Sequence, residues 1–190
     1  MRIGQVLLAT EATDTADHLV ELVCALSRHS VHQHVLVGDE QVARRFAAID
    51  RVTIGPLVRT PVMACCLMPD VDIAHTHDQK SGQTGLLLTL TRSVPFVVTL
   101  PARTTHISAA ASPIIRAVYR RARCIVCQSD DDTDSVRSRY PDALIEHIPP
   151  IELRDSCVGA GVINPERAAA QYMKVYRRTI DSGRLPAMML

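Results

Sequence analysis

Two histidines and an aspartate stand together near the middle of the chain, where an apolar run ends. His75 and His77 share one face of a strand over residues 73–76 because they are two residues apart, and Asp78 begins the loop that follows. Imidazole rings beside a carboxylate could orient a hydroxyl group of a ligand or bind a metal ion. Spacing identifies no third metal ligand, so we expect no metal. The structural alternative is that one histidine is buried against the next helix while the other caps it.

Polar residues follow other predicted strands and could lie near this pair. Ser81 and Gly82 open the next helical pattern, whose free backbone amides could receive an anion, although Ser81 is equally suited to cap the helix. Arg103 follows the fifth strand, where it could reach a phosphate, but a solvated loop arginine is the plainer alternative. Since parallel strands end at one edge of a sheet, we expect a substrate-binding group there. Its residues are His75, His77, Asp78, Ser81, Gly82, Arg103 and Ser129. The sequence assigns no catalytic residue.

Seven apolar runs alternate with helical patterns along the first 150 residues. The runs are continuous rather than alternating, which is typical of parallel strands covered on both faces. They span residues 5–10, 35–38, 52–54, 73–76, 96–100, 124–128 and 144–148, and the helical patterns lie near 15–28, 39–47, 61–68, 82–92, 109–121 and 130–139. This order predicts an α/β fold with a single Rossmann-like, doubly wound parallel sheet.

One more helix is predicted after a connector. Asn164 is a good N-cap, Pro165 suits the first helical position, and an apolar stripe follows, which includes Tyr172 and Tyr176. We therefore divide the chain into a domain over residues 1–150, a connector over 151–163 and a C-terminal helix over 164–190. This helix should pack back on the domain and bury both tyrosines.

Composition and charge narrow the classes of protein. The chain has 190 residues, of which 47% are hydrophobic and 22% charged, with a net charge of +1. These values are typical of one globular domain and exclude disorder over most of the length. The low aromatic content and near-zero net charge argue against nucleic acid as a partner. No apolar run reaches the about 18 residues of a transmembrane helix, so we expect a cytoplasmic protein with at most peripheral contact at the inner face of the membrane.

Three further groups of residues have a structural interpretation as well as a functional one. Cys124 and Cys127 have the C-x-x-C spacing, but their odd separation places them on opposite faces of a strand, which favours buried structural thiols over a zinc or redox site. The acidic residues 130–132 are expected in the first turn of a helix. Four arginines near a helix end complement its dipole, with anionic lipid headgroups as the alternative contact; they are Arg116, Arg120, Arg121 and Arg123.

Three segments together resemble the acceptor-side domain of family 4 glycosyltransferases, which have two facing Rossmann-like domains. The segments cover residues 72–78, 94–99 and 119–129. The resemblance implies the first half of the glycosyltransferase B fold plus a C-terminal return helix. In that family a second domain, which holds the nucleotide-sugar donor, follows the last strand. Here only about a dozen residues separate Pro150 from Asn164, so the resemblance implies that the donor-binding domain is missing.

Two positions depart from the family pattern. Residues 14–17 read Asp-Thr-Ala-Asp where the family usually has a Gly-Gly-Ala-Glu turn, and Pro101 stands where the family has a histidine that faces the reacting centre. Carboxylates at that turn repel phosphate, and the loss of glycine removes a close backbone approach. Both changes count against ordinary glycosyl transfer by this chain alone.

The residues and the resemblance predict a glycosyltransferase-like protein that recognises a sugar or a lipid-linked acceptor. It would be one subunit of a split enzyme, inactive as an isolated chain and without a cofactor of its own. The alternative is a non-enzymatic Rossmann-like binding or scaffold protein. A hydrolase of small phosphorylated sugars lacks an evident nucleophile and base. In the first two cases the open carboxyl edge of the sheet predicts a partner chain or a homo-oligomer.

Overall fold

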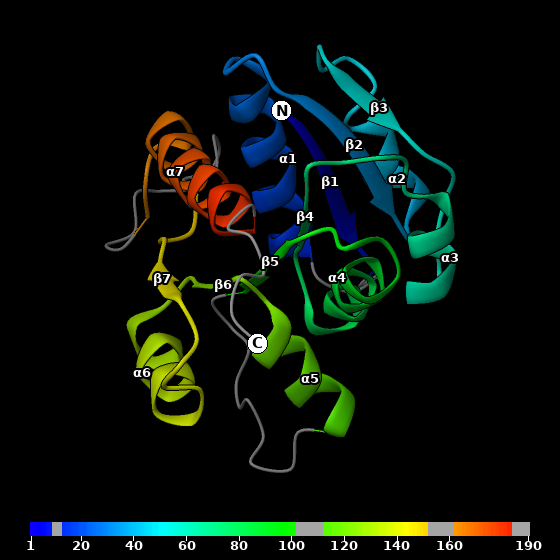
Figure 1. The fold of residues 1–190 in the computed structure, drawn as a ribbon. Coiled ribbons are helices and arrows are strands. Elements are labelled where there is room, and N and C mark those ends of the chain that lie inside the picture. Colours follow the sequence, from blue (N-terminus) through cyan, green and yellow to red (C-terminus); the bar gives the residue numbers. More distant parts are fainter. Residues whose placement is uncertain (9–12, 102–111, 152–161, 184–190) are drawn as a thin grey trace.

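A parallel sheet forms the middle of the molecule (Figure 1). The computed structural model describes residues 1–8, 13–101, 112–151 and 162–183. Its seven strands have the order β3-β2-β1-β4-β5-β6-β7, and every neighbouring pair is parallel. They are β1 (Arg2–Leu7), β2 (His32–Val37), β3 (Val52–Ile54), β4 (Ile73–Thr76), β5 (Phe96–Leu100), β6 (Cys124–Cys127) and β7 (Ile145–His147). The predicted doubly wound α/β fold is confirmed.

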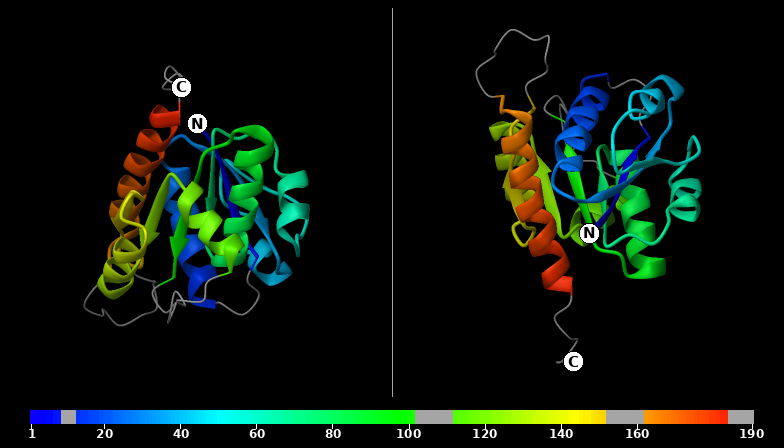
Figure 2. Two further views of the ribbon diagram at one scale, coloured as in Figure 1. Left: turned by 60° about the horizontal axis from the view of Figure 1, so that its bottom comes forward. Right: turned by 90° about the horizontal axis from the view of Figure 1, so that it is seen from above.

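Helices cover both faces of this sheet, and Figure 2 shows α7 and α4 on opposite sides of it. One face packs against α1 (Thr13–Ser27), α2 (Glu40–Arg44) and α7 (Pro165–Gly183). The other face packs against α3 (Pro61–Leu67), α4 (Gln79–Arg92), α5 (Pro113–Arg121) and α6 (Asp130–Arg139). Burial of the strands on both sides explains their continuous apolar runs.

Several element boundaries differ from the prediction, among them the starts of β1 and α4. Strand β1 begins at Arg2 rather than at residue 5, because its first residues already pair with β2. Helix α4 begins at Gln79 rather than at residue 82, because Asp78 is its N-cap and accepts a hydrogen bond from the amide of Ser81. Ser81 therefore lies in the first turn of the helix and does not precede it.

Helix α7 packs along α1 and over β4 and β5, as its apolar stripe predicted. Ala168, Ala169, Tyr172 and Tyr176 are fully buried against the sheet. Asn164 caps the helix, since its side-chain oxygen accepts a hydrogen bond of 2.8 Å from the amide of Glu166.

Two residues between β7 and α7, Ile151 and Ile163, are neighbours in the structure although 12 positions separate them in the sequence. Ile151 and Ile163 form a parallel bridge, and the amide of Ile163 donates to the carbonyl of Pro150 at 2.9 Å. The two ends of residues 152–161 are therefore held side by side.

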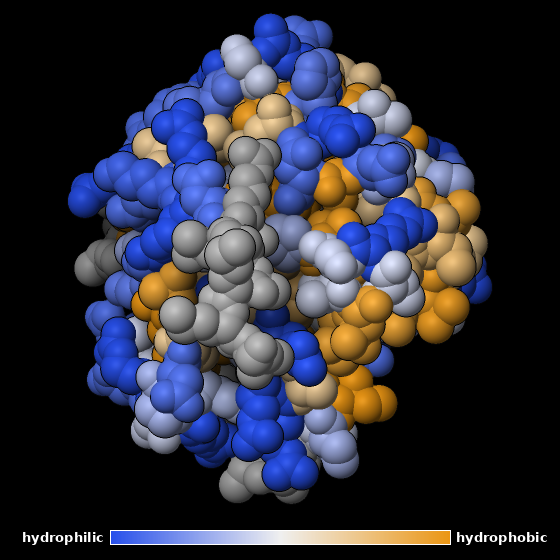
Figure 3. All heavy atoms as spheres, in the orientation of Figure 1, coloured by the Kyte–Doolittle hydropathy of each residue, from blue (hydrophilic) through white to orange (hydrophobic). Residues whose placement is uncertain are grey.

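On the face that Figure 3 shows, apolar side chains gather over α3 and α4. The exposed ones among them include Val62, Met63, Leu67 and Leu90. A patch of this kind is typical of a contact surface. Within the described residues, no helix is both long and apolar enough to cross a membrane.

Candidate functional site

Several of the predicted site residues lie near the topological switch point of the sheet. Strands β1 and β4 are neighbours, and the chain leaves them toward opposite faces: β1 leads into α1, and β4 leads into α4. Open α/β sheets bind ligands in the crevice outside the carboxyl ends of such strands. Leu8 and His77 follow the two strands directly, and the amide of His77 donates to the carbonyl of Val6 at 3.1 Å.

Asp78 and Ser81 connect the end of β1 to the start of α4. The amide of Ser81 donates to Asp78 Oδ1 at 2.7 Å, and the Ser81 hydroxyl donates to Asp78 Oδ2. The amide of Leu8 donates to Asp78 Oδ2 at 3.1 Å and to Ser81 Oγ at 2.8 Å. Both side chains are buried. They therefore hold the backbone of Leu8 directly after β1.

Behind this edge, a layer of buried polar side chains crosses the sheet beneath α1 and α7. We call it the polar layer, and its members are Gln5, His18, Gln33, His75, His77, Thr99, Gln128, Tyr172 and Tyr176, each of which is at most 7% exposed. The strand members point to the same face because paired residues of neighbouring parallel strands share a face, as Gln5 and His75 do.

His75 lies at the centre of the polar layer. Its Nδ1 is 2.6 Å from the hydroxyl of Tyr176, and its Nε2 is 2.7 Å from the hydroxyl of Thr99. The Thr99 hydroxyl is in turn 3.2 Å from that of Tyr172. Both ring nitrogens of His75 are therefore satisfied inside the protein, and two of the hydroxyls that surround it come from α7.

His18 joins α1 to the same layer. Its Nε2 lies 3.3 Å from the hydroxyl of Tyr172, and its Nδ1 lies 3.0 Å from the side-chain nitrogen Nε2 of Gln128, which follows β6. The layer thus reaches from α1 to the carboxyl end of β6.

His77 has one unused ring nitrogen. Its Nε2 donates to Gln5 Oε1 at 2.8 Å, and Gln5 Nε2 donates to Gln33 Oε1 at 3.2 Å. With its proton on Nε2, the neutral ring carries a lone pair on Nδ1, and this buried atom has no hydrogen-bond partner in the described part of the chain. His77 is the layer member that follows β4 directly at the switch point.

Burial keeps the three histidines of the layer neutral. It lowers the pKa of His18 to about 4, and it lowers the pKa values of His75 and His77 well below 6.5. The rings also repel one another's charge, since those of His75 and His77 have centroids 4.0 Å apart. Among the described residues, no group of three or more His, Cys, Asp or Glu side chains has an arrangement that could hold a metal ion.

The remaining predicted site residues have separate places. A Cβ on Gly82 would lie 2.7 Å from Val118 Cγ1, so this glycine allows α4 and α5 to pack closely. Ser129 caps α6, where it accepts from the amide of Asp132 at 3.1 Å. Arg103 lies outside the described residues. The structure therefore brings His75 beside His77 and Asp78 beside Ser81, and it sets Ser129 at the end of β6.

The sequence analysis did not include most members of the polar layer. Gln5 and Thr99 lie within apolar strand runs, Gln33 stands just before one, and His18 lies on a helix whose neighbours Leu19 and Leu22 are buried. Such polar residues inside apolar patterns were the available signal, because a buried polar side chain requires a partner.

The comparisons with known proteins identify the fold. No family model and no curated protein matches the chain. A solved structure of sucrose-phosphate synthase from Thermosynechococcus elongatus is 14% identical, with a TM-score of 0.58, and the match covers 94% of this chain and 98% of that one. HepE from Anabaena, in complex with UDP, is 12% identical with a TM-score of 0.60, and the match covers 80% of this chain but only 44% of HepE. A second HepE structure, with UDP and glucose, is also 12% identical, with a TM-score of 0.58 over 80% of this chain and 45% of HepE. The chain thus spans less than half the length of HepE. It has the Rossmann-like α/β fold found in glycosyltransferases of the GT-B class.

Proposed function

We propose that this chain recognises the acceptor in a glycosyl transfer reaction and that a second chain supplies the donor-binding half. The observation that carries the proposal is the cluster of buried polar side chains, His77, Asp78 and Ser81, at the switch point of a sheet that resembles those of GT-B glycosyltransferases. The acceptor would be a sugar or a lipid-linked sugar, and it would lie against the carboxyl ends of β1, β4 and β5.

The unused nitrogen of His77 supports a ligand that bears hydroxyl groups. A neutral imidazole with a free lone pair accepts a hydrogen bond from a hydroxyl, and a buried acceptor without a partner loses roughly 1–3 kcal/mol relative to a paired one. In this proposal Asp78 and Ser81 position the end of β1 through their hydrogen bonds to the amide of Leu8. His75 orients the polar layer next to His77. Arg103 and Ser129 would border the ligand.

A separate donor chain is supported by the extent of the structural match. HepE, whose structures contain UDP, is more than twice as long as the part that this chain matches. The exposed apolar patch over α3 and α4 offers one surface for such a partner or for a second copy of the chain.

The alternative is a binding or scaffold protein without enzymatic activity. It is favoured by His75, both of whose ring nitrogens are used inside the protein, and by Pro101 after β5. Under this alternative the polar layer only holds α7 in place.

Titration of the labelled protein with a panel of free and phosphorylated hexoses, followed by amide and histidine-ring NMR, tests the proposal. We expect shifts at Leu8, His77 and Ser81, and these should be lost in Asp78→Asn but retained in Asp39→Asn, a matched cap of α2. Shifts spread evenly over the surface, or none with any hexose, would reject acceptor recognition at this edge and favour the scaffold.

A further inference from the structure

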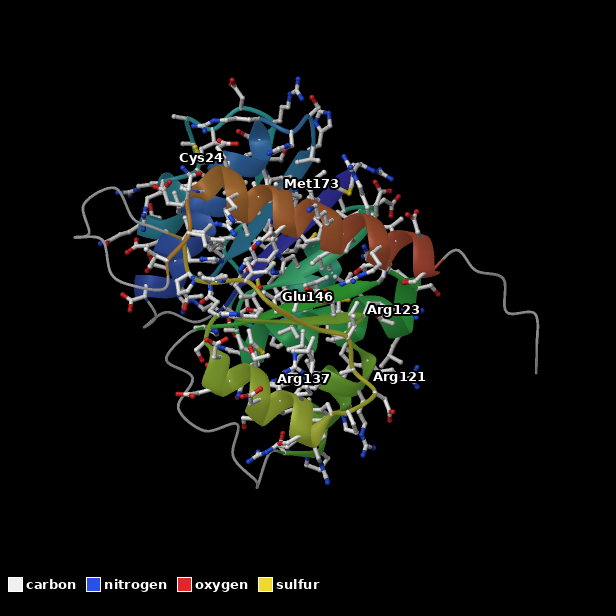
Figure 4. All side chains as sticks on the ribbon, turned by 90° about the vertical axis from the view of Figure 1, so that its left-hand side faces the viewer. Cys24, Arg121, Arg123, Arg137, Glu146 and Met173 are labelled. Atoms are coloured by element: carbon white, nitrogen blue, oxygen red, sulfur yellow. The ribbon has the colours of Figure 1, made fainter. Side chains whose placement is uncertain are left out.

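A polar hollow opens at the amino edge of the sheet, opposite the switch point. It has a volume of about 810 Å³, and we call it the arginine hollow, defined by Arg120, Arg121, Arg123, Arg139, Tyr140 and Asp142. A smaller hollow of about 400 Å³ adjoins it and shares Arg121 and Arg123. Figure 4 labels these two arginines on the same side of the molecule.

Much of the positive charge in the arginine hollow is uncompensated. The guanidinium groups of Arg120, Arg121 and Arg123 share one carboxylate among the described residues that line the hollow, that of Asp142. None of Arg120, Arg121 and Arg123 forms an ion pair with another described residue. Asp72, in the smaller hollow, already accepts from the amide of Arg2 at 2.7 Å.

The dipole of α5 does not account for this cluster. The carboxyl end of a helix carries roughly half a negative charge, which suits Arg120 and Arg121 in the last turn. Arg123, however, lies beyond the helix at the start of β6, and Arg139 comes from α6. Arginines from separate elements thus converge on one hollow.

The backbone beneath the hollow is held in place. The amide of Arg123 donates to the carbonyl of Phe96 at 2.9 Å, and that of Ala122 donates to the carbonyl of Val118 at 2.8 Å. Tyr140 packs edge-on against the buried Tyr119, with ring centroids 5.3 Å apart. The arginines therefore extend from backbone positions that hydrogen bonds and packing fix relative to the sheet.

We propose that the arginine hollow binds a phosphate-bearing anion that is larger than inorganic phosphate, such as pyrophosphate or a phosphate ester. The planar guanidinium fork matches phosphate oxygens in pairs, and arginine is the side chain best suited to this contact. The volume exceeds that of one phosphate and falls within the usual range for small-molecule sites. Because this site is at the amino edge, it does not depend on acceptor recognition at the carboxyl edge. A soluble phosphate ester and a phospholipid headgroup share this chemistry.

Calorimetric titration with sodium pyrophosphate at constant ionic strength tests the proposal. The variant Arg121→Gln with Arg123→Gln should weaken binding at least about tenfold, as the loss of a charge-assisted hydrogen bond usually does. The control Arg44→Gln with Arg137→Gln removes the same charge from exposed arginines that pair with Glu40 and Asp134, and it should leave binding unchanged. Circular dichroism confirms that both variants are folded.

Flotation with vesicles separates the two sources of phosphate. Phosphatidylglycerol vesicles that bind the protein but not the Arg121/Arg123 variant would identify a lipid headgroup, whereas pyrophosphate binding without vesicle binding would identify a soluble ligand. The proposal is overturned if neither probe binds, or if the control variant loses binding as much as the hollow variant, since that result indicates only general attraction of charges.

Discussion

Removal of one hydroxyl from α7 tests whether the polar layer stabilises the fold. In Tyr176→Phe the ring and its packing are kept, but the 2.6 Å hydrogen bond to His75 Nδ1 is lost. Tyr176 and His75 are both fully buried, so water cannot replace the hydroxyl without rearrangement. A buried polar atom left without a partner destabilises a protein by roughly 1–3 kcal/mol. For a chain of this length each kcal/mol lowers the melting temperature by about 2–4 °C, so we expect a decrease of about 2–12 °C.

The measurement is urea and thermal unfolding at pH 7.5, followed by far-ultraviolet circular dichroism. Tyr140→Phe is the matched control, because its side chain is partly exposed and its hydroxyl has no hydrogen-bond partner in the described structure. The control should change stability by less than about 0.5 kcal/mol, as surface substitutions usually do. If Tyr176→Phe costs no more than the control, the polar layer does not secure α7 and our assignment of His75 is wrong.

Three further predictions follow from the same structure. Because burial depresses the pKa values of the three layer histidines, that of His18 to about 4, the unfolded chain takes up more protons below pH 6.5 and stability should be lost as the pH falls from 6.5 toward 4. The slope of the free energy of unfolding against pH, measured by urea unfolding at several pH values, should approach about 4 kcal/mol per pH unit for three protons. Equal stability at pH 7.5 and 5.5 would contradict the neutral state of the three histidines. Asp78→Ala should destabilise the protein by roughly 2 kcal/mol, because Asp78 is buried and also accepts a hydrogen bond from the amide of Leu8, whereas Asp39→Ala should destabilise it by about 1 kcal/mol. Equal losses in chemical unfolding would show that Asp78 is only a helix cap. The isolated chain should not bind UDP-glucose, because residues 14–17, expected as a turn, lie at the start of α1 and place two carboxylates there: Asp14 is exposed, and Asp17 pairs with Arg45 at 2.5 Å. Micromolar binding in calorimetry would refute this prediction.

The order of elements could be predicted because the central strands β1, β4, β5 and β6 are buried on both faces, which gives continuous apolar runs. Helix α7 followed from Asn164 as N-cap, Pro165 at the first position and the spacing of the apolar stripe, and its packing on the sheet agrees. The start of α4 could not be decided locally, since Asp78 and Ser81 are both good caps. The contact of Asp78 with Leu8, 70 residues away in the sequence, is a tertiary feature that local patterns do not contain.

The role of His75 shows the same limit more strongly. Its spacing from His77 correctly placed both rings on one face of β4, but it could not indicate what covers that face. The answer is Tyr176, 101 residues later in the chain. Ligand contact by His75, His77, Asp78, Ser81, Gly82, Arg103 and Ser129 stays a prediction, and the unused nitrogen of His77 is the part of it that the geometry favours most.

The bridge between Ile151 and Ile163 makes the fold insensitive to the length of chain that joins them. Since the two ends are already hydrogen-bonded to each other, the sheet and α7 fit together in the same way whatever lies between them. The entropy of closing a loop grows only with the logarithm of its length, by about 0.6 kcal/mol for each doubling. A segment of ten residues and one long enough to fold as a domain of its own would therefore differ by only a few kcal/mol at this point. The junction is a place where evolution could insert or delete an entire domain without redesigning the rest of the protein.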